Sequence, residues 1–403
     1  MLEIQKVRDA AKRIENIAVK TPFAYAPVLS SFCNTQIFLK KENLQLTGAF
    51  KVRGAFNKIA SLTQEEKGRG IVAASAGNHA QGVALSAKHF AIQATIVMPE
   101  STPLTKVNGV ADFGANVVLH GSNYDEAYAH ALELEEKQNL TFIHPFSDEA
   151  VIAGQATIAL EMLETIEDLD AIVIPVGGGG LISGISQTCK QLKPSIKVIG
   201  VTASGAPGLK TSFESGKNMG PKEVRTIADG IAVRDTSDVT LDLMLESVDE
   251  IVDVDDKEIA SAILFLLERQ KLLVEGAGAV GVAAMMHKKI EMAPSQKVGV
   301  LLSGGNIDVT MLSVIIEKGL VKSGRKMKLM VTLIDKPGSL MKLTEILSQV
   351  NANIVHIGYD RTSTSLAYGD ANVNIEVETK GERHQEEIRL QLKDNGYLFE
   401  QLS

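Results

Sequence analysis

The sequence predicts an α/β protein with a largely parallel sheet, followed by a small α+β module. Over about the first 320 residues, short apolar runs alternate with helical stretches, as in chains whose strands are joined by crossover helices. These runs are apolar along their whole length, which is typical of parallel strands buried on both faces. Beyond this region the strand-like runs alternate apolar and polar residues, which indicates a sheet with one face in solvent.

The elements of the larger part follow from hydrophobic periodicity. Apolar residues at helical spacing predict a helix over residues 5–18. Continuous apolar runs, each ended by Gly, Pro or a polar turn, predict strands at 71–73, 94–98, 115–119, 171–176, 197–201 and 297–302. Helices are predicted after three of these strands, at 79–88, at 124–137 and from the glycines to 191.

The C-terminal part begins after a polar, basic stretch at 318–326, which reads as a linker. Alternating runs predict strands at 328–334, 353–359, 372–378 and 397–402, with helices at 337–350 and 386–395. The order β-α-β-β-α-β is that of a ferredoxin-like module. We therefore predict a first domain at 1–320, a linker at 321–326 and a second domain at 327–403.

Composition narrows the class of protein. Hydrophobic residues make up 45% of the 403 residues, so the chain can bury a large core, and the net charge of −8 argues against nucleic acid as a partner. Cys33 and Cys189 are too few for a disulfide framework and have no metal-binding spacing, which favours a reducing compartment. The charged N-terminus lacks a signal core and no apolar run is long enough to span a membrane. We expect a cytoplasmic protein with no membrane partner.

Four consecutive glycines, Gly177–Gly180, end one apolar strand and open a helix. Free backbone N–H groups at such a helix start, together with the helix dipole, favour a phosphate. A plain tight turn is the alternative. No Lys-Ser/Thr pair follows, so this is not a nucleotide P-loop, and Ile182 and Ser183 stand where the last glycine of a dinucleotide-binding motif would fall. The spacing therefore argues against a dehydrogenase.

Two other segments offer complementary chemistry. Lys51 lies in the pattern Gln45-x-Thr47-Gly48-x-Phe50-Lys51-x-Arg53-Gly54-Ala55. An aldehyde cofactor requires one lysine that reacts with it, and Phe50 would supply an apolar ring face, although an isolated lysine is more often a solvated helix residue. The segment Ser303-Gly304-Gly305-Asn306 offers a hydroxyl for a ring nitrogen. Together with the glycines, these segments would make a cofactor site.

These motifs carry a family resemblance. With Ser75-Ala76-Gly77-Asn78-His79-Ala80-Gln81-Gly82, Ala153-Gly154-Gln155 and Thr226-Ile227-Ala228-Asp229-Gly230, they resemble the threonine dehydratases, or threonine ammonia-lyases, over nearly the whole chain. That family belongs to the tryptophan-synthase-β-like, fold type II group of pyridoxal-phosphate enzymes. The resemblance implies two open-sheet α/β subdomains, the smaller at about 50–155. The C-terminal module resembles an ACT domain, a regulatory fold that commonly binds amino acids.

The resemblance also implies roles for individual residues. Lys51 would hold pyridoxal 5'-phosphate as a Schiff base and act as the catalytic base. The remaining cofactor contacts would come from Phe50, Asn78, Gly177, Gly178, Gly179, Gly180, Leu181 and Ser303. The substrate would meet Ser75, Ala76, Gly77, Asn78, Gln155 and Gly230, and the helix start after Ser75 suits its carboxylate. A serine at the ring nitrogen, rather than a carboxylate, suits β-elimination because it does not hold that nitrogen protonated.

The implied reaction is deamination of L-threonine to 2-oxobutanoate and ammonia, with L-serine giving pyruvate as a secondary reaction. Isoleucine or valine would bind the ACT-like domain at Gly338, Ser339, Asn353 and Ile354, in a homo-oligomer that is a tetramer or dimer. A serine dehydratase or racemase is one alternative, and a catalytically silent amino-acid sensor is another. Ala76 stands where racemases of the group carry a serine, and Thr202 and Gly208 stand where they bind a cation, so no metal site is predicted.

Overall fold

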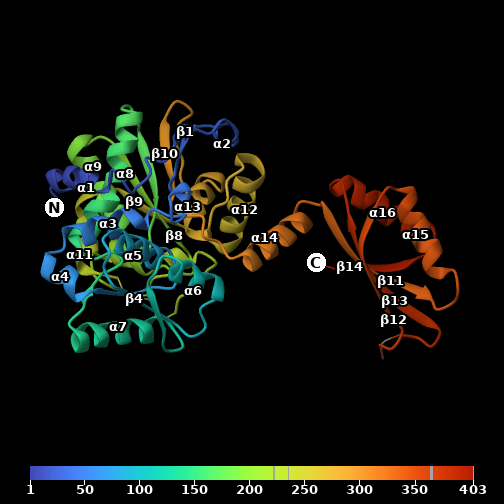
Figure 1. Cartoon of the computed structure of the whole chain (residues 1–403). Helices are drawn as coiled ribbons and strands as arrows, with labels where there is room; N and C mark the ends of the chain where they lie inside the picture. The colour runs from blue at the N-terminus through green and yellow to red at the C-terminus, as the bar shows by residue number, and fades with distance from the viewer. Residues whose placement is uncertain (221–222, 235, 364–365, 403) are drawn as a thin grey trace. The chain divides into compact units, whose positions relative to one another are not determined.

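The computed structural model describes residues 1–403 except 221–222, 235, 364–365 and 403. The chain forms two compact units, Met1–Ile307 and Asp308–Ser403 (Figure 1). The boundary therefore falls before the predicted one near residue 320. Helix α14 (Val309–Lys322) belongs to the second unit and begins where the Asp308 carboxylate accepts hydrogen bonds from the N–H groups of Thr310 and Met311. Of the linker predicted at 321–326, residues 321–322 are the end of α14 and strand β11 begins at Lys326, so residues 323–325 join the two elements.

The larger sheet of the first unit has six strands in the order β1-β2-β10-β7-β8-β9. All neighbours are parallel except the pair β1–β2. The strand bounds are β1 (Phe23–Tyr25), β2 (Gln36–Lys41), β7 (Ala171–Pro175), β8 (Lys197–Ala203), β9 (Glu250–Val254) and β10 (Lys297–Leu302). Every residue of β7 is buried, as its continuous apolar run predicts. Strand β7 leads into helix α9 through the four glycines.

Helices connect and cover these strands (Figure 1). Their bounds are α1 (Ile4–Ile14), α2 (Pro27–Cys33), α8 (Glu149–Thr165), α9 (Gly180–Leu192), α10 (Gly208–Ser215), α11 (Asp238–Ser247), α12 (Asp256–Phe265) and α13 (Gly276–Met286). Short helical turns η1 (Glu42–Leu44), η2 (Asp229–Ile231) and η3 (Leu266–Gln270) complete the set. The core consists of side chains from α8, α9 and the central strands. This packing holds the glycine turn rigidly at the carboxyl end of β7.

A second, four-stranded parallel sheet lies within residues 71–142, in the order β5-β4-β3-β6. Its strands are β3 (Ile71–Ala74), β4 (Ala94–Met98), β5 (Asn116–Leu119) and β6 (Thr141–Phe142). The accompanying helices are α3 (Lys51–Ser61), α4 (Gln64–Arg69), α5 (Asn78–His89), α6 (Leu104–Ala111) and α7 (Tyr124–Gln138). This part has its own apolar core and falls inside the range 50–155 expected for a smaller subdomain.

The second unit is an antiparallel sheet with the strand order β12-β13-β11-β14. Its elements are β11 (Lys326–Ile334), α15 (Ser339–Gln349), β12 (Asn353–Asp360), β13 (Asp370–Glu378), α16 (Glu382–Asp394) and β14 (Leu398–Leu402). Burial alternates along β11 and β13, because one face packs on the helices and the other faces solvent. The predicted fold class, α/β with a C-terminal α+β module, is confirmed.

The four residues predicted to bind an effector do not come together within one copy of the second unit. Asn353 and Lys326 both lie beside Glu378, at one end of the sheet. Gly338 and Ser339 follow the opposite end of β11, which is nine residues and therefore about 27 Å long. Asn353 and Ile354 are thus separated from Gly338 and Ser339 by the length of the sheet.

Among the described residues, no helix is long and apolar enough to cross a membrane. In the same part of the chain, no group of three or more His, Cys, Asp or Glu side chains is arranged to hold a metal ion.

Candidate active site

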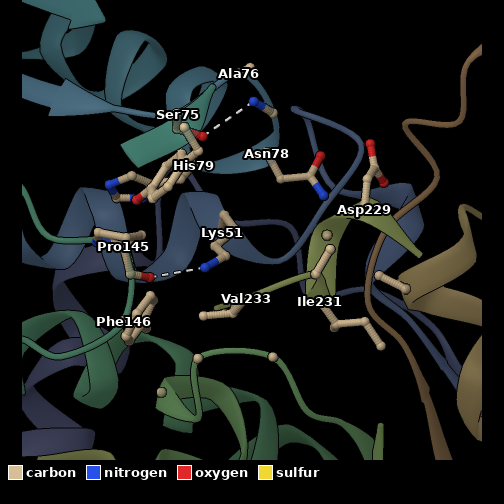
Figure 2. Close-up of a pocket in the computed structure, with 18 of the residues that line it drawn as sticks. Lys51, Ser75, Ala76, Asn78, His79, Pro145, Phe146, Asp229, Ile231 and Val233 are labelled. Carbon is tan, nitrogen blue, oxygen red and sulfur yellow. Dashed lines mark hydrogen bonds between the residues drawn. The ribbon is translucent and has the colours of Figure 1, made fainter. Parts of the chain in front are cut away.

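A cavity of about 820 Å³ opens in the first unit between the glycine turn and the smaller sheet (Figure 2). Side chains and backbone from segments far apart in the sequence line it. All predicted cofactor and substrate residues except Gln155 are among them, namely Phe50, Lys51, Ser75, Ala76, Gly77, Asn78, Gly177, Gly178, Gly179, Gly180, Leu181, Gly230 and Ser303. The fold therefore brings the three sequence segments to one place.

Lys51 is the first residue of α3, and the chain before it is fixed against the end of β10. Phe50 donates its N–H to the Ser303 carbonyl at 3.0 Å. The Lys51 ammonium donates to the Pro145 carbonyl at 2.9 Å and lies 5.4 Å from the centre of the Phe50 ring. Burial lowers the pKa of Lys51 to about 8, with the Glu275 carboxylate partly opposing this effect. The amine is therefore much closer to its neutral, reactive form than a surface lysine is.

The glycine turn is shaped for an anion. Gly179 has φ +88°, in the left-handed region that favours glycine, and no side chain caps α9. The N–H groups of the first turn of α9 thus face the cavity without a capping side chain. A Cβ at Gly178 would lie 2.4 Å from the Phe146 ring, and a Cβ at Gly180 would lie 2.5 Å from the Phe146 carbonyl oxygen. Only glycine fits at these positions without a clash. Together with the uncapped helix start, this favours a phosphate-binding site over a plain tight turn.

This crowding gives a first prediction. Gly180→Ala pushes the turn against the backbone of Phe146, which cannot move as a side-chain tip can. We expect at least a 10-fold loss of pyridoxal 5'-phosphate affinity, measured by equilibrium titration of protein stripped of cofactor. Gly68→Ala is the matched control, because a Cβ there has no neighbour within 4 Å. Unchanged affinity in Gly180→Ala would contradict a phosphate site at this turn.

The segment Ser75–Asn78 forms a turn that opens α5. The helix begins at Asn78, and Ser75 does not cap it, because its hydroxyl instead accepts the Gly77 N–H at 3.2 Å. No side chain caps α5, so its first N–H groups are available to a carboxylate. His79 has a structural role: its ring Nε2 contacts the Ile143 carbonyl at 2.8 Å. Burial, then Lys51, lowers the pKa of His79 to about 3, so it stays neutral.

A chain of amides and one carboxylate fixes Asn78. The Asn78 side-chain nitrogen donates to Glu275 at 2.7 Å, and its oxygen accepts from Asn306 at 2.6 Å. Asn306 also donates to the Thr47 carbonyl at 2.8 Å. Glu275 is 3% exposed, and burial and Asp229 raise its pKa to about 7 against the opposing Asn78 hydrogen bond. The amide of Asn78 is therefore held in one orientation.

Sequence reasoning missed Glu275 and gave Asn306 no role. The available signal was weak: Glu275 is a single carboxylate between the apolar residues 272–274 and the glycine-rich apolar run of α13. A charge isolated in an apolar stretch is rare unless it has a buried partner. Phe146 was also missed, although its ring packs directly against the glycine turn.

Gln155 is a correction to the predicted substrate site. It is 2% exposed in α8 and does not line the cavity. Its side-chain oxygen accepts the Gly54 N–H at 3.2 Å, where α8 crosses α3 with almost no space between the backbones. The structure therefore places Gln155 in the packing of the helix that carries Lys51, and not against a substrate.

The residues fit pyridoxal phosphate. An amine of lowered pKa, an uncapped glycine turn and the Phe50 ring line one cavity with Ser303, which follows β10. Ser303 would offer the ring nitrogen a neutral hydroxyl. Asp229 and Gly230 lie in η2 and also line this cavity.

The comparisons agree with this chemistry. A family model described as pyridoxal-phosphate dependent enzyme matches residues 14–304. The chain is 48% identical over 397 residues to an L-threonine ammonia-lyase of Thermotoga maritima, with 98% of each chain covered. It is 38% identical to an L-threonine dehydratase biosynthetic IlvA of Pasteurella multocida, over 98% of this chain and 76% of that one.

A solved structure of a processed threonine deaminase isoform 2 from Solanum lycopersicum has a TM-score of 0.74 and 37% identity, covering 78% of this chain and 87% of that one. The cavity, the family match and these relatives agree on one conclusion. The chain belongs to the pyridoxal-phosphate dependent enzymes, in the group that includes the L-threonine ammonia-lyases.

Proposed function

We propose that this enzyme deaminates L-threonine to 2-oxobutanoate and ammonia, with pyridoxal 5'-phosphate as its cofactor. The observation that carries the proposal is the meeting of the Lys51 amine, the glycine turn and the uncapped start of α5 in one cavity. The name of the Thermotoga maritima relative, which matches over its full length, supports threonine as the substrate.

Each part of the site then has a task. Pyridoxal phosphate, when bound, supplies an electron-withdrawing ring that stabilises negative charge at the Cα of the amino acid. The turn Ser75–Asn78 binds the substrate carboxylate and so orients the Cα–H bond. Lys51, whose pKa is lowered to about 8, accepts the Cα proton. Departure of the Cβ hydroxyl as water gives an enamine, whose hydrolysis releases 2-oxobutanoate and ammonia.

The side chain at position 76 favours elimination over racemisation. Ala76 lines the cavity beside Ser75, and a methyl group neither gives nor takes a proton. A racemase needs a second acid/base group opposite the lysine. We therefore propose a lyase, with L-serine converted to pyruvate as a secondary reaction.

The second unit is proposed to be regulatory. Its strand order and its βαββαβ sequence support an ACT-like domain that binds isoleucine or valine. Gly338 and Ser339 lie far from Asn353 and Ile354 within one copy, so a site that uses all four requires two copies. This supports a homo-oligomer. The Pasteurella multocida relative is named a biosynthetic L-threonine dehydratase, which supports a biosynthetic role, and we propose that this role is isoleucine synthesis in the cytoplasm.

A steady-state survey tests both proposals. We expect release of 2-oxobutanoate from L-threonine and, less efficiently, of pyruvate from L-serine. Isoleucine or valine should change the threonine saturation curve of the native protein by about 5-fold or more in half-saturating concentration. Asn353→Ala should weaken this response and leave the activity without effector unchanged. No keto acid from either substrate would refute the lyase, and an effector response equal in both proteins would remove Asn353 from regulation.

A further inference from the structure

One segment of the first unit, Asp229–Arg234, lines the cavity along its whole length and is called the strap here. Its two ends are held by ion pairs to the helices of the smaller sheet. Asp229 pairs with Lys106 of α6 at 2.9 Å, and Arg234 pairs with Asp125 of α7. Lys106, Asp125 and every residue of the strap line the cavity. The strap is therefore linked at both ends to helices of the smaller sheet.

Between the two charged ends, the strap presents apolar side chains. Gly230 carries none, Ala232 is small, and Ile231 and Val233 are branched. The charges at both ends are already paired, so the middle of the strap presents no unpaired charge among the described residues. This is the environment that a methyl group prefers over a hydroxyl or water.

The two branched residues have different neighbours. Ile231 is 5% exposed, and a Cβ at Gly177 would lie 2.9 Å from the Ile231 Cα, so Ile231 is packed against the glycine turn. Val233 is only half-buried. Its direction is set by a tight turn: Ala232 has φ −76° and ψ 65°, and the Val233 N–H donates to the Ile231 carbonyl at 2.9 Å. Figure 2 shows Val233 on the side of Lys51 away from Ser75 and Ala76.

The substrate has three parts that the cavity must accommodate. In the proposed function, its carboxylate is held at the turn Ser75–Asn78, and its nitrogen would take the place of the Lys51 amine at the cofactor aldehyde. The remaining part is the Cβ substituent, which is a hydroxyl plus a methyl in threonine and a hydroxyl alone in serine. The half-buried apolar side chain that the strap directs into the cavity is available to contact that methyl.

We propose that Val233 is a specificity-determining residue whose side chain forms the wall against which the β-methyl group of threonine packs. This inference rests on the proposed function and assigns the preference for threonine over serine to the strap. One methyl group in an apolar pocket changes the ratio of kcat/KM between two substrates roughly 10-fold or more. A single side chain is therefore enough to set the preference for threonine over serine.

The test compares two substrates in one protein. In Val233→Ala, we expect the ratio of kcat/KM for L-threonine to that for L-serine to fall roughly 10-fold. Val233→Thr keeps the shape but replaces one methyl group with a hydroxyl, and the ratio should fall there too. The ratio is independent of the fraction of folded enzyme, so partial misfolding does not affect it. The control is Val239→Ala: Val239 is 51% exposed on α11 and outside the cavity, so its ratio should equal that of the native protein.

A binding measurement gives a readout without turnover. L-2-Aminobutyrate and L-alanine are threonine and serine without the leaving hydroxyl, and they differ only by the methyl group. Their dissociation constants can be read from the absorbance change of the holoenzyme. We expect the native protein to prefer L-2-aminobutyrate and Val233→Ala to lose roughly 10-fold of that preference. Unchanged ratios in both variants, in a protein that deaminates threonine, would overturn the role of Val233, whereas a native protein that forms no 2-oxobutanoate would overturn the proposed function.

Discussion

Replacing Lys51 with alanine is expected to abolish nearly all deamination of L-threonine, with kcat lowered by at least about 10³-fold. The substitution removes the cavity amine that is both the proposed attachment point and the proposed base. Lys88→Ala is the control, because Lys88 is exposed on the neighbouring helix α5 and lies outside the cavity. The two variants should unfold at similar urea concentrations, so that a loss of kcat in Lys51→Ala reports chemistry.

Two further measurements separate the roles of this lysine. Borohydride treatment of the native holoenzyme should bleach its visible absorption and leave the cofactor fixed to the peptide that contains Lys51, as mass spectrometry can show. A small primary amine added to Lys51→Ala should restore part of the lost kcat if the residue acts as a base. Full activity in Lys51→Ala, or label on another lysine, would contradict the assignment.

The lowered pKa of Lys51 explains why this one amine among many is reactive. With a pKa of about 8, about a tenth of the amine is neutral at pH 7, whereas an ordinary lysine near 10.5 is almost wholly protonated. The cause is tertiary. The fold buries the Lys51 amine against Pro145, 94 positions away, and this burial lowers the pKa although the Glu275 carboxylate opposes the shift.

Local pattern was sufficient for elements that are apolar and sharply bounded. Strand β4 runs from Ala94 to Met98, as predicted, because Pro99 ends a run that is apolar except for Thr95. Strand β2 was missed because its sequence, QIFLKK, ends in two lysines and reads as polar. It is nevertheless an interior strand of the large sheet, because Lys40 finds the carboxylate of Glu161 there, 121 positions away. Only the folded chain brings those charges together.

The candidate site likewise contains residues that short motifs predict and residues whose role only the fold determines. Lys51, Asn78, the glycines and Ser303 were found because their chemistry is carried by short, specific motifs. Gln155 was misassigned because a motif position does not say which way a side chain faces, and the crossing of α3 and α8 decides that. Glu275 and Val233 were missed because each acquires its setting from contacts that the fold creates.

Lys51 begins α3, and the same helix is anchored two residues later by a buried charge network. Arg53 is fully buried and its guanidinium contacts both carboxylate oxygens of Glu42, at 2.8 and 2.9 Å, and both of Glu161, at 2.6 and 3.0 Å. Lys40 completes the group, so two positive and two negative charges balance. Two bidentate pairs satisfy most of the donors of Arg53 and fix the helix axis.

Arg53→Ala is therefore expected to destabilise the first unit by about 3–5 kcal/mol, because it leaves the buried carboxylate of Glu42 and the partly buried one of Glu161 to share the single cation Lys40. Arg53→Lys should lose less unfolding free energy, since lysine keeps the positive charge but lacks the planar guanidinium that pairs with two carboxylates. Arg69→Ala, which breaks the exposed pair Arg69–Glu65, is the control and should change stability by less than about 1 kcal/mol. Urea unfolding followed by circular dichroism measures all three, and equal midpoints for Arg53→Ala and the control would refute an anchoring role.

The pH dependence of the stability lost in Arg53→Ala shows whether the charge of Arg53 or its packing stabilises the fold. Burial alone would raise the pKa of Glu42, but Arg53 and then Lys40 hold it below its usual value of 4.5. A carboxyl whose pKa is lowered in the folded protein stabilises the fold above its usual pKa and loses that contribution as pH falls. The gap in unfolding free energy between the native protein and Arg53→Ala should therefore be largest near pH 7 and should shrink below about pH 4.5. A gap that does not vary with pH would mean that the lost stability comes from the packing of the Arg53 side chain rather than from its charge.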